Sequence, residues 1–144
     1  KSVPIIATTD DTPMEGGEVY AIETFGTTGS GFVEEDGSCS HYMWNYEGGP
    51  EVDELRARIK KKSTLALMDH IIKKYKTLAF CRRWLEDAGF KNHEAALESL
   101  VEHGAIMPCP PLCDRPGCFI AQFEHTIYLG HDGHKEVLSR GEDY

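Results

Sequence analysis

The sequence has no long apolar run. No stretch approaches the roughly 20 apolar residues that a membrane-spanning helix needs, and no basic segment followed by an apolar centre opens the chain. The first residue is Lys1 rather than Met, so we expect the natural N-terminus to lie elsewhere. These absences predict a soluble protein with no membrane partner.

The chain also lacks a surplus of basic residues. Its 144 residues include 15 Lys and Arg against 24 Asp and Glu, a formal net charge of −9. A general nucleic-acid binder neutralises phosphates with Lys and Arg, so we expect no direct nucleic-acid readout. Residues 51–104 hold 11 of the basic and 9 of the acidic residues, a net of +2, which leaves −11 on the remainder. This asymmetry marks residues 51–104 as a separate structural piece.

Cysteines are few, odd in number and unevenly spaced. Five cysteines of this kind fit a reduced protein of the cytoplasm better than a disulfide framework. Cys109, Cys113 and Cys118, with His131 and His134 downstream, offer a zinc alternative. Zinc knuckles use two-residue spacing between paired cysteines, which this segment lacks, so packing is the preferred interpretation for these cysteines.

β-branched and aromatic residues with period-2 alternation predict several extended segments. These segments are residues 3–7, 18–25, 41–46, 118–129 and 135–140. Apolar residues occur on both sides of the strand at 18–25, so we expect both of its faces to be buried. The Gly-rich residues 26–31 predict a hairpin loop rather than a phosphate-binding loop, because neither a Lys nor a helical pattern follows.

Helical periodicity begins after residue 50. The spacing of apolar residues predicts one helix over 63–75, a second from about Thr77 to Gly89, and a third from near Asn92 to Gly104. Three short helices before a Pro-rich segment suggest a helix-turn-helix unit with a β wing. Acidic residues interrupt any basic face on the later helices, so a packing or pocket-building role is favoured over nucleic-acid binding.

Two carboxylates interrupt the predicted strands. Glu23 and Glu124 are each set among apolar residues, where a bare carboxylate costs several kcal/mol unless it is protonated, ion-paired or bound to a metal. A buried ion pair is short of partners, because outside the helical piece the only basic residues are Lys1, Arg115, Lys135 and Arg140. Thr24, His125 and Thr126 stand beside the carboxylates. The combination favours a site for a divalent ion such as Mn²⁺, Fe²⁺, Co²⁺ or Zn²⁺.

Six motifs, in order along nearly the whole chain, resemble the type 2 methionine aminopeptidases. They are AIETF at 21–25, CSHYM at 39–43, TLAFCRRWL at 77–85, PPLCD at 110–114, AQFEHT at 121–126 and SRGEDY at 139–144. The resemblance implies an α+β chain, the C-terminal part of a pita-bread (creatinase/aminopeptidase) fold with a helical winged-helix-like insertion. Residues 1–50 and 105–144 would form the C-terminal half of the catalytic domain, and residues 51–104 the helical insert subdomain.

The resemblance also implies a metal-dependent methionyl aminopeptidase, a hydrolase that removes the N-terminal methionine of nascent polypeptides. In this family two Asp, one His and two Glu hold two divalent ions (Co, Mn, Fe or Zn), and the two Glu match Glu23 and Glu124. Glu124 would bridge the two ions and Glu23 would bind one of them. The other ligands would precede Lys1, so the chain alone is expected to be inactive. Its expected partners are then the missing N-terminal part of the same protein and the ribosome.

Residues of the methionine pocket follow from the same resemblance. His41, Met43 and Ala79 match pocket residues, and their soft or apolar walls suit a thioether side chain. Cys109 stands where relatives carry a pocket-lining tyrosine, which puts the size of the pocket in question but not the chemistry. The alternative function is a non-catalytic relative of the same fold that acts as a ribosome-associated or binding module. Retention of both Glu residues favours the enzyme.

Overall fold

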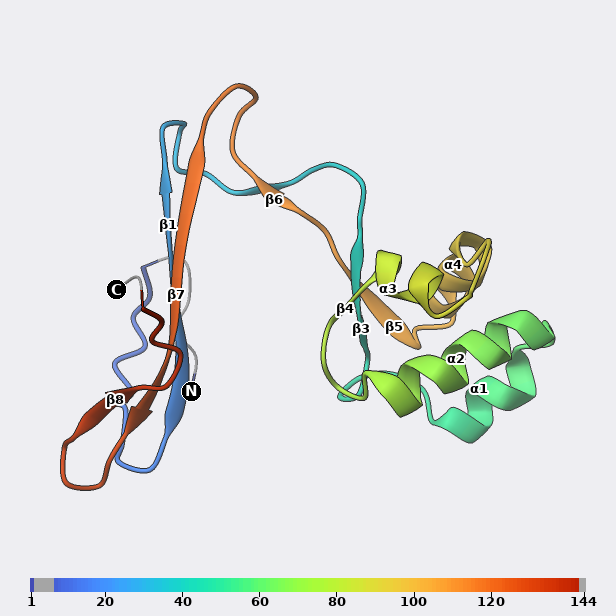
Figure 1. Ribbon diagram of the computed structural model, residues 1–144, viewed down its shortest axis with the longest axis horizontal. Coiled ribbons are helices and arrows are strands. Elements are labelled where there is room, and N and C mark those ends of the chain that lie inside the picture. The colour runs from blue at the N-terminus through green and yellow to red at the C-terminus, as the bar shows by residue number, and fades with distance from the viewer. Residues whose placement is uncertain (2–6, 143–144) are drawn as a thin grey trace. The chain divides into compact units, whose positions relative to one another are not determined.

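The computed structural model describes residue 1 and residues 7–142 (Figure 1). The chain forms two compact units. The first combines Lys1–Val33 with the segment that starts at Asp114, and the second is Glu34–Cys113. The expected domain boundaries, at residues 50/51 and 104/105, differ from these limits and stay a prediction. The strand predicted at residues 3–7 lies outside the described residues except for Ala7.

The first unit contains a three-stranded antiparallel sheet. Its strands are β1 (Val19–Thr27), β7 (Ile120–Leu129) and β8 (Lys135–Val137), in the order β1-β7-β8. β1 and β7 are the long paired strands in Figure 1. Three of the predicted strands are thereby confirmed. The predicted hairpin after residue 25 is wrong, because β1 pairs with β7 from the far end of the sequence.

The expectation that both faces of β1 are buried is also wrong. Tyr20 is 9% exposed, but Val19 is 58%, Phe25 45% and Phe123 59% exposed. All four helices of the described chain belong to the second unit, so no helix of the first unit covers its sheet. An apolar sheet of this kind is typical of one layer of a larger domain.

The Gly-rich loop after β1 wraps around the carboxylate of Asp114. This carboxylate accepts hydrogen bonds from the backbone N–H groups of Ser30 and Gly31, both at 2.9 Å, from the Ser30 hydroxyl at 2.7 Å and from the Thr27 hydroxyl at 3.0 Å. These bonds, the Ser30 backbone bond first, hold the pKa of Asp114 well below its usual range. A Cβ at Gly29 would lie 2.4 Å from the same carboxylate, so the close approach requires glycine.

The second unit packs helices on a small sheet. The helices are α1 (Val52–Arg58), α2 (Lys62–Lys74), α3 (Arg82–Asp87) and α4 (Glu94–Glu102). The sheet has the order β4-β3-β5, with β4 at Phe80–Cys81, β3 at His41–Trp44 and β5 at Ile106–Cys109. A short ribbon pairs β2 (Glu34–Glu35) with β6 (Leu112–Cys113).

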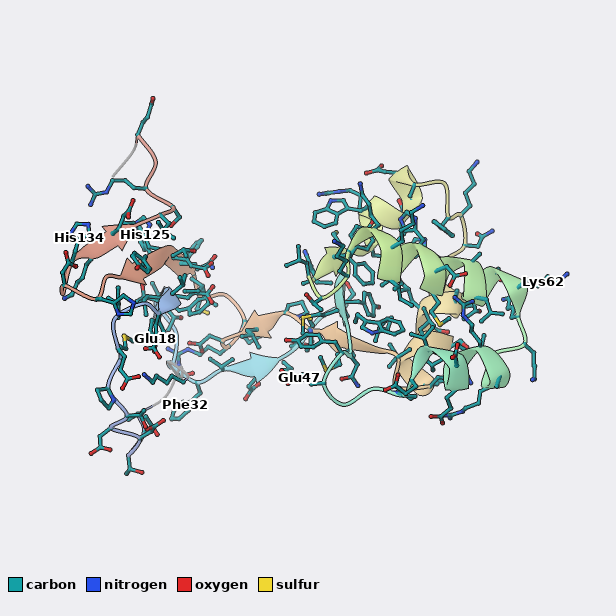
Figure 2. All side chains as sticks on the ribbon, turned by 90° about the horizontal axis from the view of Figure 1, so that it is seen from below. Glu18, Phe32, Glu47, Lys62, His125 and His134 are labelled. Carbon is teal, nitrogen blue, oxygen red and sulfur yellow. The ribbon has the colours of Figure 1, made fainter. Side chains whose placement is uncertain are left out.

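Most of the buried core lies in this second unit, where side chains fill the space between helices and sheet (Figure 2). Its largest fully buried side chains are Leu55, Leu67, Met68, Ile71, Phe80, Leu85, Leu97, Leu100 and Ile106. Phe80 stacks on Tyr75, with ring centroids 4.9 Å apart, and on Tyr42 at 6.2 Å. This packing holds Phe80 in a strand.

The helices predicted at 63–75 and 92–104 are confirmed as α2 and α4 to within a few residues. The helix predicted from Thr77 begins only at Arg82, because residues 80–81 pair with β3. Helix α1 was not predicted, although Leu55 and Ile59 at i, i+4 spacing and the acidic first turn were available signals.

We predict that Leu100→Ala lowers the free energy of unfolding of the second unit by about 2–5 kcal/mol, because Leu100 is fully buried. Leu78→Ala is the matched control, since Leu78 is 73% exposed and its truncation is expected to change stability by less than about 0.5 kcal/mol. Denaturant unfolding followed by tryptophan fluorescence measures this unit, because Trp44 and Trp84 both lie in it. Equal losses in the two variants would refute the packing described here.

We predict that Asp114→Asn destabilises the loop after β1 at pH 7 and much less near pH 2. Because the folded pKa of Asp114 is depressed, its contribution is present above the ordinary pKa of about 3.9 and is lost as the pH falls below it. Amide exchange at Ser30 and Gly31 and melting curves at both pH values measure the effect, with the exposed Asp11→Asn as control. Unchanged protection of these two amides at pH 7 would contradict the loop's dependence on Asp114.

Candidate metal-ligand pair and substrate pocket

Glu23 and Glu124 face each other across two paired strands. In the register of β1 and β7 they are direct Cα partners, so their side chains leave the same face of the sheet. Cβ atoms of directly opposite residues in an antiparallel pair lie about 4.5–5.5 Å apart. Two residues from distant parts of the sequence thereby place two carboxylates side by side.

The two carboxylates are exposed, and like charges directly opposite each other destabilise a sheet. Glu23 Oε1 accepts a hydrogen bond from the amide of Gln122, which lies on the same face. Among the described residues neither carboxylate forms an ion pair. The ammonium of Lys1 binds Glu15 at 3.0 Å and Glu18 at 2.7 Å instead. The two carboxylates therefore lack a basic partner among the described residues, as the sequence suggested. The expectation that they are buried is wrong.

The predicted polar neighbours divide between the two faces of the sheet. Thr126 shares the face of the carboxylates, but strand alternation turns Thr24 and His125 to the other face. His125 Nδ1 lies 3.1 Å from the Ser139 hydroxyl, which also accepts the Thr126 N–H at 2.9 Å. His125 is thus tied to the segment after β8. The expectation that the His125 imidazole stands beside the two carboxylates is wrong, because it leaves the opposite face of the sheet.

Within residues 1 and 7–142, no three side chains of His, Cys, Asp or Glu come together as a metal site. Glu23 and Glu124 form a pair of oxygen donors, the ligand type that divalent hard or borderline ions accept. The cysteines of the zinc alternative, Cys109, Cys113 and Cys118, are all free thiols. They form no zinc cluster in this part of the chain.

The expected methionine-pocket residues gather on the small sheet of the second unit. His41 pairs with Cys109 on one side and Cys81 on the other, and Met43 pairs with Met107. Ala79 directly precedes β4 and is exposed. Because Phe80 and Ile106 turn into the core, alternation places the five paired residues on the opposite face.

This face is rich in sulfur. Its thioethers are Met43 and Met107, and its thiols are Cys81 and Cys109. Burial, and then the nearby Cys39, raises the pKa of the Cys109 thiol, so it is neutral at pH 7 and acts as a soft wall. Sequence reasoning missed Cys81 and Met107, since only the strand register shows that they share a face with His41.

Among the described residues, no helix is both long and apolar enough to cross a membrane. No model of a protein family matches the chain. Curated proteins do match it over its whole length. It is 47% identical to methionine aminopeptidase 2A of Arabidopsis thaliana over 144 residues and 49% identical to methionine aminopeptidase 2 of Yarrowia lipolytica over 145 aligned positions. The chain covers 31% and 29% of these relatives, and so spans about three tenths of their length.

A solved structure of a thermophilic Arx1 resembles the chain with a TM-score of 0.66 and 19% sequence identity. The match covers 81% of this chain and 29% of that one. At this identity the likeness concerns the fold alone. It supports the expected α+β, pita-bread relationship.

We predict that Glu124→Gln stabilises the metal-free chain by about 0.2–1 kcal/mol, because it removes the repulsion between facing carboxylates. Glu136→Gln is the control, since Glu136 lies opposite Tyr128 in the same sheet. Denaturant melts in the presence of a chelator provide the measurement. A variant less stable than the parent chain would show that the two carboxylates do not repel each other.

Proposed function

We propose that this chain, a homologue of the C-terminal part of the type 2 methionine aminopeptidases, supplies part of the active site of a methionyl aminopeptidase. The enzyme would remove the N-terminal methionine of nascent polypeptides. The observation that carries the proposal is the direct pairing of Glu23 with Glu124. Facing carboxylates cost stability unless a cation lies between or beside them. The 45–49% identity to methionine aminopeptidases 2 over the whole chain supports the choice of activity.

In this proposal Glu23 and Glu124 would hold divalent metal ions, Glu124 being the expected shared ligand and Glu23 the expected ligand of one ion. The exposed pair fits such ions, because carboxylate oxygens are ligands that Mn²⁺, Fe²⁺, Co²⁺ and Zn²⁺ all accept. When bound, the ions would lower the pKa of a water molecule and polarise the scissile carbonyl. The amide of Gln122 would orient Glu23 by holding its Oε1.

The chain's second contribution is the recognition of the methionine side chain. His41, Met43, Ala79 and Cys109 would line its pocket, as the matching family residues do. Thioethers and a neutral thiol suit an unbranched thioether substrate, since they are polarizable and adapt to its shape. With Cys109 in place of a tyrosine, we expect a roomier pocket.

The chain would function only together with more polypeptide. It spans about three tenths of the length of its relatives. Glu23 and Glu124 are two of the five metal ligands expected. Apolar residues of β1 and β7 are also exposed. The missing ligands would come from a segment preceding Lys1. The same segment would also pack on the exposed sheet.

An enzyme that acts on nascent chains would be located in the cytoplasm, near the ribosome. Five free cysteines fit such a reducing compartment. The helical insertion would have a winged-helix-like form and would help to build the pocket. The alternative is a non-catalytic, ribosome-associated or binding module of the same fold. It would leave the facing carboxylates without a role.

We predict that the 144-residue chain alone neither binds two metal ions tightly nor cleaves a Met-Gly peptide. A chimaera that joins the preceding part of the Arabidopsis thaliana relative to this chain should do both, because the chain is 47% identical to the part it replaces. Metal content by elemental analysis and release of methionine are the measurements. Turnover by the isolated chain would overturn the claim that it holds only part of the site.

In the same chimaera, Glu124→Gln should abolish metal-dependent activity, because a neutral carboxamide is a weaker ligand for divalent ions than a carboxylate. Glu136→Gln, on the same sheet, should leave the rate unchanged. A Glu124→Gln protein with normal metal content and rate would refute the ligand assignment. A parent chimaera that folds but shows no turnover would favour the binding-module alternative.

A further inference from the structure

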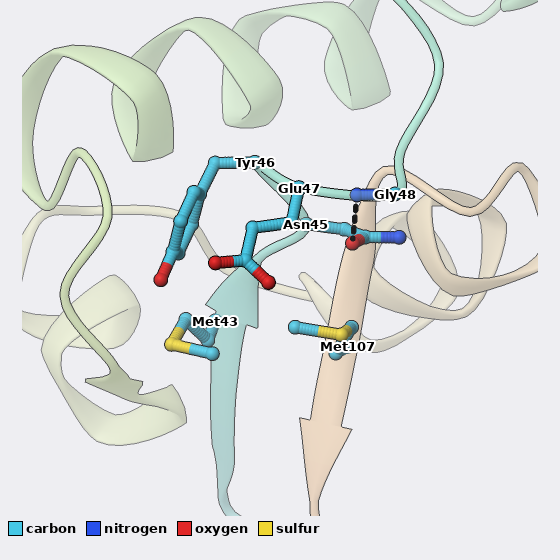
Figure 3. A pocket seen from close by; sticks show the side chains of 6 residues that line it. All are labelled: Met43, Asn45, Tyr46, Glu47, Gly48 and Met107. Atoms are coloured by element: carbon cyan, nitrogen blue, oxygen red, sulfur yellow. Dashed lines mark hydrogen bonds between the residues drawn. The ribbon is translucent and has the colours of Figure 1, made fainter. Parts of the chain in front are cut away.

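A second pocket opens beside Met43, on the face of the small sheet that points away from the core. Its volume is about 320 Å³ (Figure 3). It is lined by Met43, Asn45, Tyr46, Glu47, Gly48 and Met107. Met43 belongs to the expected methionine pocket and Met107 lies beside it on the sulfur-rich face. The other four lining residues, Asn45, Tyr46, Glu47 and Gly48, have no role in the function proposed above.

Asn45 holds in place the loop that carries Glu47, the charged residue of the pocket. Its side-chain oxygen accepts the Gly48 N–H at 3.2 Å, as drawn in Figure 3, and its amide donates to the Gly104 carbonyl at 3.1 Å. Its backbone N–H donates to Ala105 O and its carbonyl accepts from Gly49, both at 3.0 Å. Asn45 therefore anchors the loop after β3, which carries Tyr46 and Glu47, to the loop before β5.

The lining has an apolar floor and one negative charge. Met43 and Met107 are cross-strand partners whose thioethers form adjacent soft surfaces. Figure 3 shows the Glu47 carboxylate pointing toward the two methionines, with the Tyr46 ring alongside. None of the lining residues is basic, and Glu47 forms no ion pair among the residues that the structure describes.

We propose that this pocket binds a lysine side chain of a polypeptide. A lysine stem of four methylenes would lie on the two thioethers, and its ammonium would reach the Glu47 carboxylate and the Tyr46 ring. The charges are complementary, and methionine surfaces adapt to unbranched chains. Only the identity of the polypeptide rests on the proposed function. Because this pocket shares Met43 with the expected methionine pocket, the bound lysine would be a substrate residue downstream of the methionine.

The four methionines allow a direct test on the 144-residue chain. With ¹³C-labelled methionine methyl groups, Met43 and Met107 report the pocket, while Met68 in the core and Met14 in the other unit are internal controls. The probes are acetyl-Gly-Lys-amide, acetyl-Gly-norleucine-amide and acetyl-Gly-Glu-amide. These peptides have no free N-terminal methionine and the readout needs no turnover, so the test is independent of aminopeptidase activity.

We expect saturable shifts at Met43 and Met107 with the lysine peptide, and weaker binding of the norleucine and glutamate peptides. Glu47→Gln should weaken lysine binding by about two- to fivefold, as expected for an exposed charge pair, and added salt should do the same. Glu86→Gln, an exposed carboxylate on α3, should have no effect. An unshifted Met68 signal shows that each variant is folded.

Three results would overturn the proposal. The first is the absence of saturable shifts at Met43 and Met107. The second is equal binding of the lysine and norleucine peptides, and the third is lysine binding that Glu47→Gln leaves unchanged, since either of these removes the role of the Glu47 charge.

Discussion

The pairing of β1 with β7 is the interaction on which the candidate site depends. It joins segments from opposite ends of the sequence and sets Glu23 directly opposite Glu124. A slip of one residue would send one of the two side chains to the other face, because side chains alternate along a strand. The register of β1 and β7 therefore determines whether the two carboxylates share a face. The Asp114 carboxylate, which holds the loop at the end of β1 next to the start of β7, supports the same pairing.

The sequence predicted the two carboxylates for a reason that is partly mistaken. The strands, the shortage of cations and the likeness to an enzyme family were all readable from the residues. Burial was not, because whether an apolar strand is covered depends on its neighbours in space, and no helix of the first unit covers β1 among the described residues. His125 was misjudged because neighbours in a strand point to opposite faces, a distinction that adjacency in sequence conceals.

In the second unit, local patterns were sufficient for α2 and α4 and insufficient for residues 77–81. Helical spacing is present there, but Phe80 stacks on Tyr42 and on Tyr75 and pairs with β3 as part of a strand. That choice has a functional consequence. It turns Cys81 to the same face as His41 and Cys109, and completes a sulfur-rich surface that only the register of three strands could show.

The central claim is that Glu23 and Glu124 are metal ligands of a site completed by further polypeptide. Anomalous X-ray diffraction from crystals of the chimaera grown with Mn²⁺ tests it most directly. The account predicts two anomalous peaks, one within coordination distance of both carboxylates and a second bound by Glu124. Peaks bound by other residues, with Glu23 and Glu124 free of metal, would contradict it.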